Sequence, residues 1–176
     1  MKKHGVPRYC KVDIEGNDLE ALKSLANAPV SPTFISVESE KHDWRQLVEQ
    51  FSIMQTIGYN RFKIIDQLYV WLQKSPQPAL EGRYCDHTFE FGSSGLFGNE
   101  LPGRWLDIFE ALELFKGIFR GYALNGENGV FGRRSDLFHL LGRLQSRMAR
   151  LRGQRTYINP AYCFPPASWY DTHAAL

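Results

Sequence analysis

The sequence predicts an α/β protein with a partial parallel sheet and a helical C-terminal extension. Strand-like and helix-like segments alternate from residue 8 to residue 67 in the order strand, helix, strand, helix, strand, an order typical of parallel sheets with crossover helices. Within the strand-like segments apolar and polar residues alternate, as in half-buried strands. Later in the chain, residues 106–119 are rich in apolar side chains, and residues 135–151 carry an apolar stripe at helical spacing.

The first strand and helix lie at residues 9–25. Apolar residues alternate with charged ones from residue 10 to residue 15, and Gly16 ends this strand. Asn17, followed three residues later by Glu20, predicts a capped start for a helix from Leu19 to Leu25.

The same arrangement follows at residues 33–66. Residues 33–40 alternate as a second strand, and Asp43 with Gln46 at the third position predicts a capped helix over residues 44–57. Gly58 stands where a left-handed helix stop is expected. Residues 61–66 supply a third strand.

The remaining chain has a weaker pattern. Residues 69–72 are expected either to extend the third strand or to begin an insertion, and residues 88–91 predict a short strand. The glycine-rich residues 92–98 predict a loop, which either closes over a substrate or only connects its two neighbouring segments. Helices are expected at residues 106–119 and at residues 135–151, the second capped by Ser135. Residues 133–155 have a net charge of about +6, which predicts either a face that binds an anionic partner or a helix face exposed to solvent.

Acidic residues follow the first two strands at the point where each strand ends. If these strands are parallel and adjacent, their carboxyl ends meet at one edge of the sheet, where open α/β sheets hold ligands. We therefore expect one cluster that contains Asp13, Glu15, Glu38 and Glu40.

These segments resemble the later half of the FkbM family of methyltransferases. The resemblance is carried by GVPRYCKVDIEGNDLEALKSL, PTFISVESE, Ile57-Gly58-Tyr59 and RFKIIDQ within residues 5–67, and more loosely by FEFGSSGLFGNELPGRW and the closing WYDTHA. It implies a partial Rossmann-like sheet of the class I methyltransferase type, with S-adenosylmethionine as the cofactor. Residues 1–105 would form the methyltransferase-like α/β half-domain, and residues 106–176 a helical C-terminal extension packed on it.

The resemblance places Asp13 and Glu15 beside the reactive end of the cofactor, where they would orient an acceptor hydroxyl or act as general base. The same carboxylates are also suited to a divalent cation or to the start of the following helix. Glu38, Glu40 and His42 are candidates for substrate binding, although charged residues that leave a strand are commonly only solvated. Asp171 and His173 would form an acid/base pair if the end of the chain folds back onto the sheet.

Composition limits the alternatives. With 176 residues, 43% of them hydrophobic, the chain can form one core, and its net charge of +2 gives no reason to expect nucleic acid as a partner. No apolar run approaches the length of a membrane span. Three widely spaced cysteines argue against disulfides and favour a reducing, cytoplasmic location.

The glycine-rich cofactor turn and the following acidic residue of the family are not found in this sequence. The resemblance therefore implies an O-methyltransferase whose cofactor pocket is completed by a second copy or by a complementary N-terminal half, and whose acceptor is a small molecule or a glycan. The alternative is a non-catalytic interaction module or a truncated relic, in which the exposed edge of the first strand and the arginine-rich helix are the functional surfaces.

Overall fold

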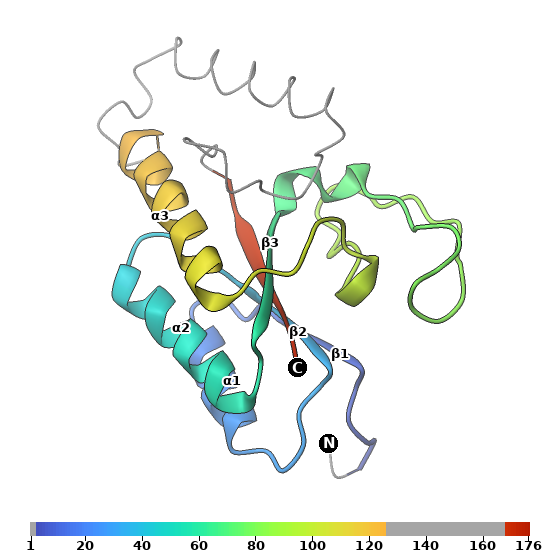
Figure 1. Ribbon diagram of the computed structural model, residues 1–176, viewed down its shortest axis with the longest axis horizontal. Coiled ribbons are helices and arrows are strands. Elements are labelled where there is room, and N and C mark those ends of the chain that lie inside the picture. Colours follow the sequence, from blue (N-terminus) through green and yellow to red (C-terminus); the bar gives the residue numbers. More distant parts are fainter. Residues whose placement is uncertain (1–2, 126–167) are drawn as a thin grey trace.

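A computed structural model describes residues 3–125 and 168–176, which form an α/β structure around a four-stranded mixed sheet (Figure 1). The elements in chain order are β1 (Tyr9–Val12), α1 (Asp18–Ala26), β2 (Phe34–Glu38), α2 (Trp44–Ile57), β3 (Arg61–Asp66), the 3-10 helices η1 (Gln67–Leu72) and η2 (Gly98–Glu100), α3 (Ile108–Asn125) and β4 (Tyr170–Ala175).

The strands lie in the order β1-β2-β4-β3. The strands β1 and β2 are parallel neighbours, with Tyr9 opposite Phe34 and Val12 opposite Val37, as the sequence predicts. The strand β4 lies antiparallel between β2 and β3. The three strands that alternate with α1 and α2 therefore run in one direction, and β4 runs against them.

The end of the chain departs from the sequence prediction. We expected a helical extension over residues 106–176, but Tyr170–Ala175 is a strand in the interior of the sheet. All six of its residues are buried. The helical part of the expectation is confirmed for α3, whereas the predicted helix at 135–151 and the basic face at 133–155 lie outside the described residues.

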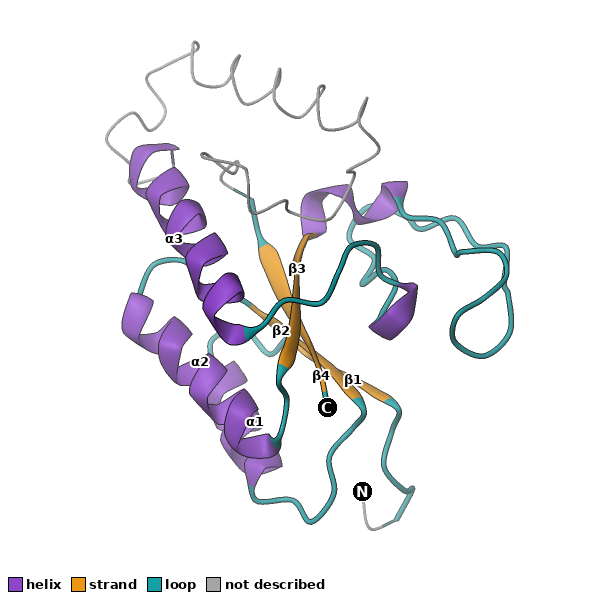
Figure 2. Ribbon diagram, in the orientation of Figure 1, coloured by secondary structure: helices purple, strands orange, loops and turns teal. Residues whose placement is uncertain are grey.

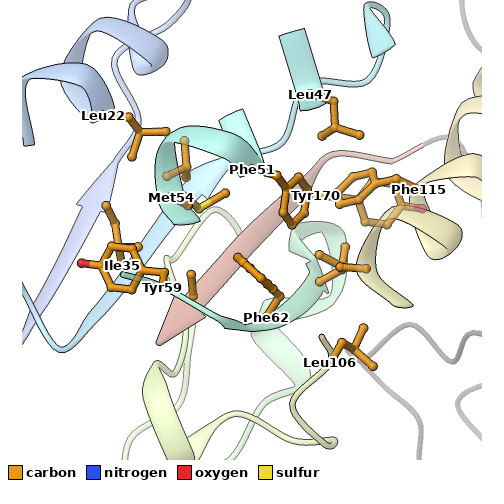
Figure 3. Close-up of a cluster of buried hydrophobic side chains, with 14 of the residues drawn as sticks. Leu22, Ile35, Leu47, Phe51, Met54, Tyr59, Phe62, Leu106, Phe115 and Tyr170 are labelled. Atoms are coloured by element: carbon orange, nitrogen blue, oxygen red, sulfur yellow. The ribbon is translucent and has the colours of Figure 1, made fainter. Parts of the chain in front are cut away.

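All three α-helices lie on the same side of the sheet (Figure 2). Right-handed crossovers from β1 to β2 and onward in the same direction place α1 and α2 on one face. The core lies between these helices and the sheet, and Figure 3 shows its aromatic centre. The ring of Phe51 lies 5.0 Å from that of Phe62 and 5.8 Å from that of Phe115, measured between centroids, so α2 packs on both β3 and α3.

The sequence predicts a capping residue at the start of both α1 and α2, but only the cap of α2 forms in the structure. Asp43 caps α2, since its side chain accepts hydrogen bonds from the backbone N–H groups of Arg45 and Gln46, and Gly58 ends this helix with φ 113° in the left-handed region. The predicted cap of α1 is wrong, because Asn17 makes no side-chain capping bond. Asp18 instead accepts a hydrogen bond from the backbone N–H of Ile14, at 3.2 Å.

The opposite face of the sheet is covered by the chain between β3 and α3, which Figure 1 shows on the side away from the helices. Tyr9 stacks on Phe97 at 4.6 Å between centroids, and Lys63 donates to the carbonyl of Leu101 at 2.7 Å. Residues 69–72 belong to the 3-10 helix η1 and do not extend β3. The predicted strand at 88–91 is wrong, because this segment is irregular.

Candidate functional site

The carboxyl ends of β1 and β2 meet at one edge of the sheet, as the acidic pattern predicts. A cavity of about 310 Å³ opens there. Its lining combines three carboxylates, two ammonium groups and one indole from Lys11, Asp13, Glu38, Lys41, Trp169 and Asp171. We call this cavity the strand-end pocket.

Lys11 organises the charges of the strand-end pocket. Its ammonium lies 2.8 Å from the carboxylate of Asp171 and 3.4 Å from that of Asp13. Burial alone would lower the pKa of Lys11, but the charge and hydrogen bond of Asp171, together with Asp13 and Tyr9, raise it above its ordinary value. The Lys11 side chain therefore stays charged and holds two carboxylates from opposite ends of the sequence together.

A second ion pair lies on the β2 side of the strand-end pocket. The ammonium of Lys41 lies 3.0 Å from a carboxylate oxygen of Glu38. Each cation therefore faces a carboxylate, and Asp13, whose side chain is 47% exposed, remains accessible to a ligand. Trp169, 39% exposed, supplies an apolar wall beside these charges. The arrangement can accept hydrogen bonds from hydroxyl groups, with carboxylates as acceptors.

Glu40 and His42 lie in the turn between β2 and α2 and not in the strand-end pocket. One oxygen of Glu40 accepts the backbone N–H groups of Lys41, His42 and Asp43, at 2.8, 2.6 and 3.1 Å. The carboxylate of Glu40 therefore stabilises the turn between β2 and α2. The imidazole of His42 packs edge-on against Tyr122, with centroids 5.5 Å apart.

A smaller cavity of about 160 Å³ lies beside this turn, near the first turns of α1 and α2. Glu38, Glu40 and His42 line it together with Gly16. Glu38 thus borders both cavities, and the structure brings the three predicted substrate-binding residues together around the smaller one.

Glu15 does not line the strand-end pocket with Asp13, although the sequence predicts both in one acidic cluster. It is exposed and has φ 45°, in the left-handed region, beside Gly16. Among the cavities found in the described residues, it borders neither the strand-end pocket nor the smaller one. A catalytic role for Glu15 stays a prediction, and its left-handed backbone conformation favours a structural role in the turn between β1 and α1.

The end of the chain does fold back onto the sheet, but Asp171 and His173 do not form the predicted acid/base pair. Asp171 binds Lys11, and the Nε2 atom of His173 has no hydrogen-bond partner among the described residues. Burial and the ammonium groups of Lys11 and Lys63 lower the pKa of His173 to about 3. His173 is therefore a neutral, buried residue at neutral pH.

The glycine-rich loop at 92–98 packs on the beginnings of β1 and β2 and does not line the strand-end pocket. Phe97 stacks on Tyr9, and Gly98 approaches the ring of Phe34 so closely that a Cβ atom would lie 2.9 Å from it. Tyr9 and Phe34 begin β1 and β2, whereas the carboxylates follow the other ends of these strands. The loop is a packed connector in this structure and does not close over Asp13.

Sequence reasoning named Asp13 and Glu38 but missed their partners Lys11, Lys41 and Trp169. The signal for Lys11 was present, because side chains two residues apart on a strand share a face and Lys11 precedes Asp13 by two. No such local signal exists for Trp169, because its position depends on the placement of β4. Among residues 3–125 and 168–176, no group of three or more histidine, cysteine or acidic side chains is arranged to hold a metal ion.

Comparisons with protein-family models, with curated proteins and with solved structures found no match to this chain. In the part of the chain that the structure describes, no helix combines the length and the apolar character required to cross a membrane.

Proposed function

We propose that this chain carries the acceptor side of an S-adenosylmethionine-dependent O-methyltransferase with a Rossmann-like sheet. The observation that supports the proposal most is the strand-end pocket, in which Asp13 remains accessible between two ion pairs at the carboxyl ends of parallel strands. The FkbM-like segments of residues 5–67 include β1 and β2, which supply four of the six residues that line this pocket with the turns that follow them.

The proposed chemistry assigns each side chain one task. Methylation of a hydroxyl requires removal of its proton, and Asp13 is the accessible carboxylate that accepts it. Lys11 positions Asp13 through the 3.4 Å ion pair, and Asp171 holds Lys11 in turn. Trp169 offers its face to the apolar part of a small-molecule or glycan acceptor.

The described residues do not by themselves form a complete site for S-adenosylmethionine. The turn between β1 and α1 holds a single glycine, Gly16, and a Cβ atom there would meet nothing within 4 Å, so this turn is no close-fitting backbone cradle. The proposal therefore concerns the acceptor side, and it assigns most of the cofactor contacts to a second copy of the chain or to a complementary N-terminal half.

The test uses the ¹⁵N-labelled full chain and follows amide chemical shifts during titration with a pooled panel of glycosides and small alcohols, alone and in the presence of S-adenosylhomocysteine. Saturable shifts at residues 11–16 and 38–42, strengthened when both ligands are present, are expected. A folded chain without such shifts, or with shifts confined to other segments, overturns the proposal.

The second candidate, a non-catalytic interaction module, is favoured by one observation. The strand β1 pairs only with β2 in the described sheet, so its other edge offers unpaired backbone groups to a partner strand. This function predicts a mass that rises with concentration in sedimentation velocity, together with no response to the acceptor panel in the titration above.

A further inference from the structure

A second large cavity lies outside the sheet, in the segment between β3 and α3. Its volume is about 450 Å³, and its lining comes from two stretches of this segment, within residues 71–77 and 84–88. Figure 1 shows this segment extending beyond the sheet, between η1 and η2. None of its lining residues borders the strand-end pocket. We call it the arm pocket.

Two aromatic side chains border the arm pocket while remaining partly open to solvent. Trp71 is 41% exposed and Tyr84 is 42% exposed. Exposure of large aromatic rings to water is unfavourable in free energy, so a concave site that contains them is suited to a ligand. Indole and phenol groups combine an apolar face with a polar edge. Such rings suit a ligand that is itself apolar on one face and polar around its rim.

Gln73 adds a polar group whose hydrogen bonding is incomplete. Its side chain accepts the backbone N–H of Leu96 at 2.7 Å through Oε1, which fixes the orientation of the amide. The Nε2 atom is buried and has no hydrogen-bond partner among the described residues. An unpaired buried donor is unfavourable by about 1–3 kcal/mol, and Gln73 is among the residues that line the arm pocket.

The charges around the arm pocket restrict the class of ligand. Lys74 and Asp86 contribute opposite charges, so the lining offers no excess of positive charge for a phosphate group. A wholly apolar ligand is also disfavoured, because it would remove the exposed side chains of Asp86 and His87 from water without replacing their hydrogen bonds. The volume lies within the range of ordinary small-ligand sites, about 300–1,000 Å³.

We propose that the arm pocket binds one residue of a neutral saccharide, with Trp71 and Tyr84 against the face of the sugar ring and the polar side chains at its hydroxyl groups. A pyranose ring has the required shape, because its axial C–H groups form an apolar face and its hydroxyl groups lie around the rim. This inference does not rest on the proposed methyltransferase function, since the two pockets share no lining residue.

The experiment is saturation-transfer difference NMR of the full chain with methyl glucoside, methyl galactoside, methyl mannoside and methyl N-acetylglucosaminide. At least one glycoside is expected to receive saturation at its ring protons. Trp71→Ala should weaken that binding by about tenfold or more, equivalent to about 1.4 kcal/mol. Trp71→Phe, which keeps an aromatic face, should weaken it by about threefold or less.

Phe109→Ala is the matched control, because Phe109 is an aromatic residue, 79% exposed, that lines neither the arm pocket nor the strand-end pocket. It should leave the glycoside signal unchanged, and thermal unfolding should show that all variants are folded. Loss of the signal in Trp169→Ala, which alters the strand-end pocket, with retention in Trp71→Ala would overturn the inference and place the sugar in the strand-end pocket. Absence of transfer to any glycoside, or binding of glucose 6-phosphate or AMP with no binding of neutral sugars, would also overturn it.

Discussion

The ammonium of Lys11 lies 2.8 Å from the carboxylate of Asp171, although 160 residues separate them in the chain. Lys11 belongs to β1 and Asp171 to β4, and β2 lies between these strands. The ion pair thus crosses a strand to connect the edge of the sheet with its interior, and it forms the floor of the candidate site. Since the Asp171 side chain is 3% exposed, its charge depends on Lys11 for compensation.

Replacing Lys11 by methionine should reduce the free energy of unfolding by about 3 kcal/mol, because it leaves a buried carboxylate unpaired. Urea denaturation measures the change. The control is Lys23→Met, since Lys23 is 45% exposed and pairs with Glu20 on the surface, and its loss should be much smaller because exposed ion pairs are screened by water. The double variant Lys11→Met/Asp171→Leu should recover at least about half of the loss. Equal effects of the two single variants would contradict this account.

Asp43→Ala should destabilise the protein by about 1 kcal/mol, because it removes the hydrogen bonds that cap α2. Asn17→Ala at the corresponding position of α1 should change stability by less than about 0.5 kcal/mol, since Asn17 makes no capping bond. Thermal or urea unfolding of the two variants tests the difference. Comparable losses in both would show that Asn17 caps α1 in solution.

The stability of the protein should decrease in acid because of His173. The pKa of this imidazole is about 3 in the folded chain and 6.5 as its ordinary value. Between these values the unfolded chain binds a proton that the folded chain does not. The free energy of unfolding should therefore fall as pH decreases below about 6, with a slope of up to about 1.4 kcal/mol per pH unit from this group.

His173→Gln isolates that contribution, and its unfolding free energy should depend less steeply on pH between about 6 and 4. Asp66 acts in the opposite direction, because burial raises its pKa to about 6 and the folded chain takes up its proton first. Asp66 is present in both proteins, so their difference reports on His173. Parallel pH profiles would mean that His173 is protonated in the folded state.

The two carboxylates that follow β1 should differ in function. Asp13→Asn should lower acceptor-dependent release of S-adenosylhomocysteine from S-adenosylmethionine by about 10²-fold or more, since a general base contributes roughly 10²–10⁴-fold. Glu15→Gln should retain activity within about twofold, because Glu15 borders neither cavity at this edge. A larger loss in Glu15→Gln than in Asp13→Asn would reverse the proposed roles.

Local sequence signals predicted the first three strands, α1, α2 and the start of the α3 region with nearly correct bounds. These elements depend on features within a few residues of the chain. The strands β1 and β2 show alternating apolar and polar residues, and α2 has a cap at Asp43 and a left-handed end at Gly58. The same signals predicted that Asp13 and Glu38 would meet, because parallel adjacent strands place their carboxyl ends together.

Only the tertiary structure decided where Tyr170–Ala175 lies. Its small and polar residues resemble a frayed end, and they become a buried strand because β2 and β3 supply backbone partners on both sides. That insertion brings Asp171 to Lys11 and Trp169 to the rim of the strand-end pocket. The sequence alone determined the strands and helices formed by neighbouring residues, whereas the charge balance of the site arises from hydrogen bonding between segments more than a hundred residues apart.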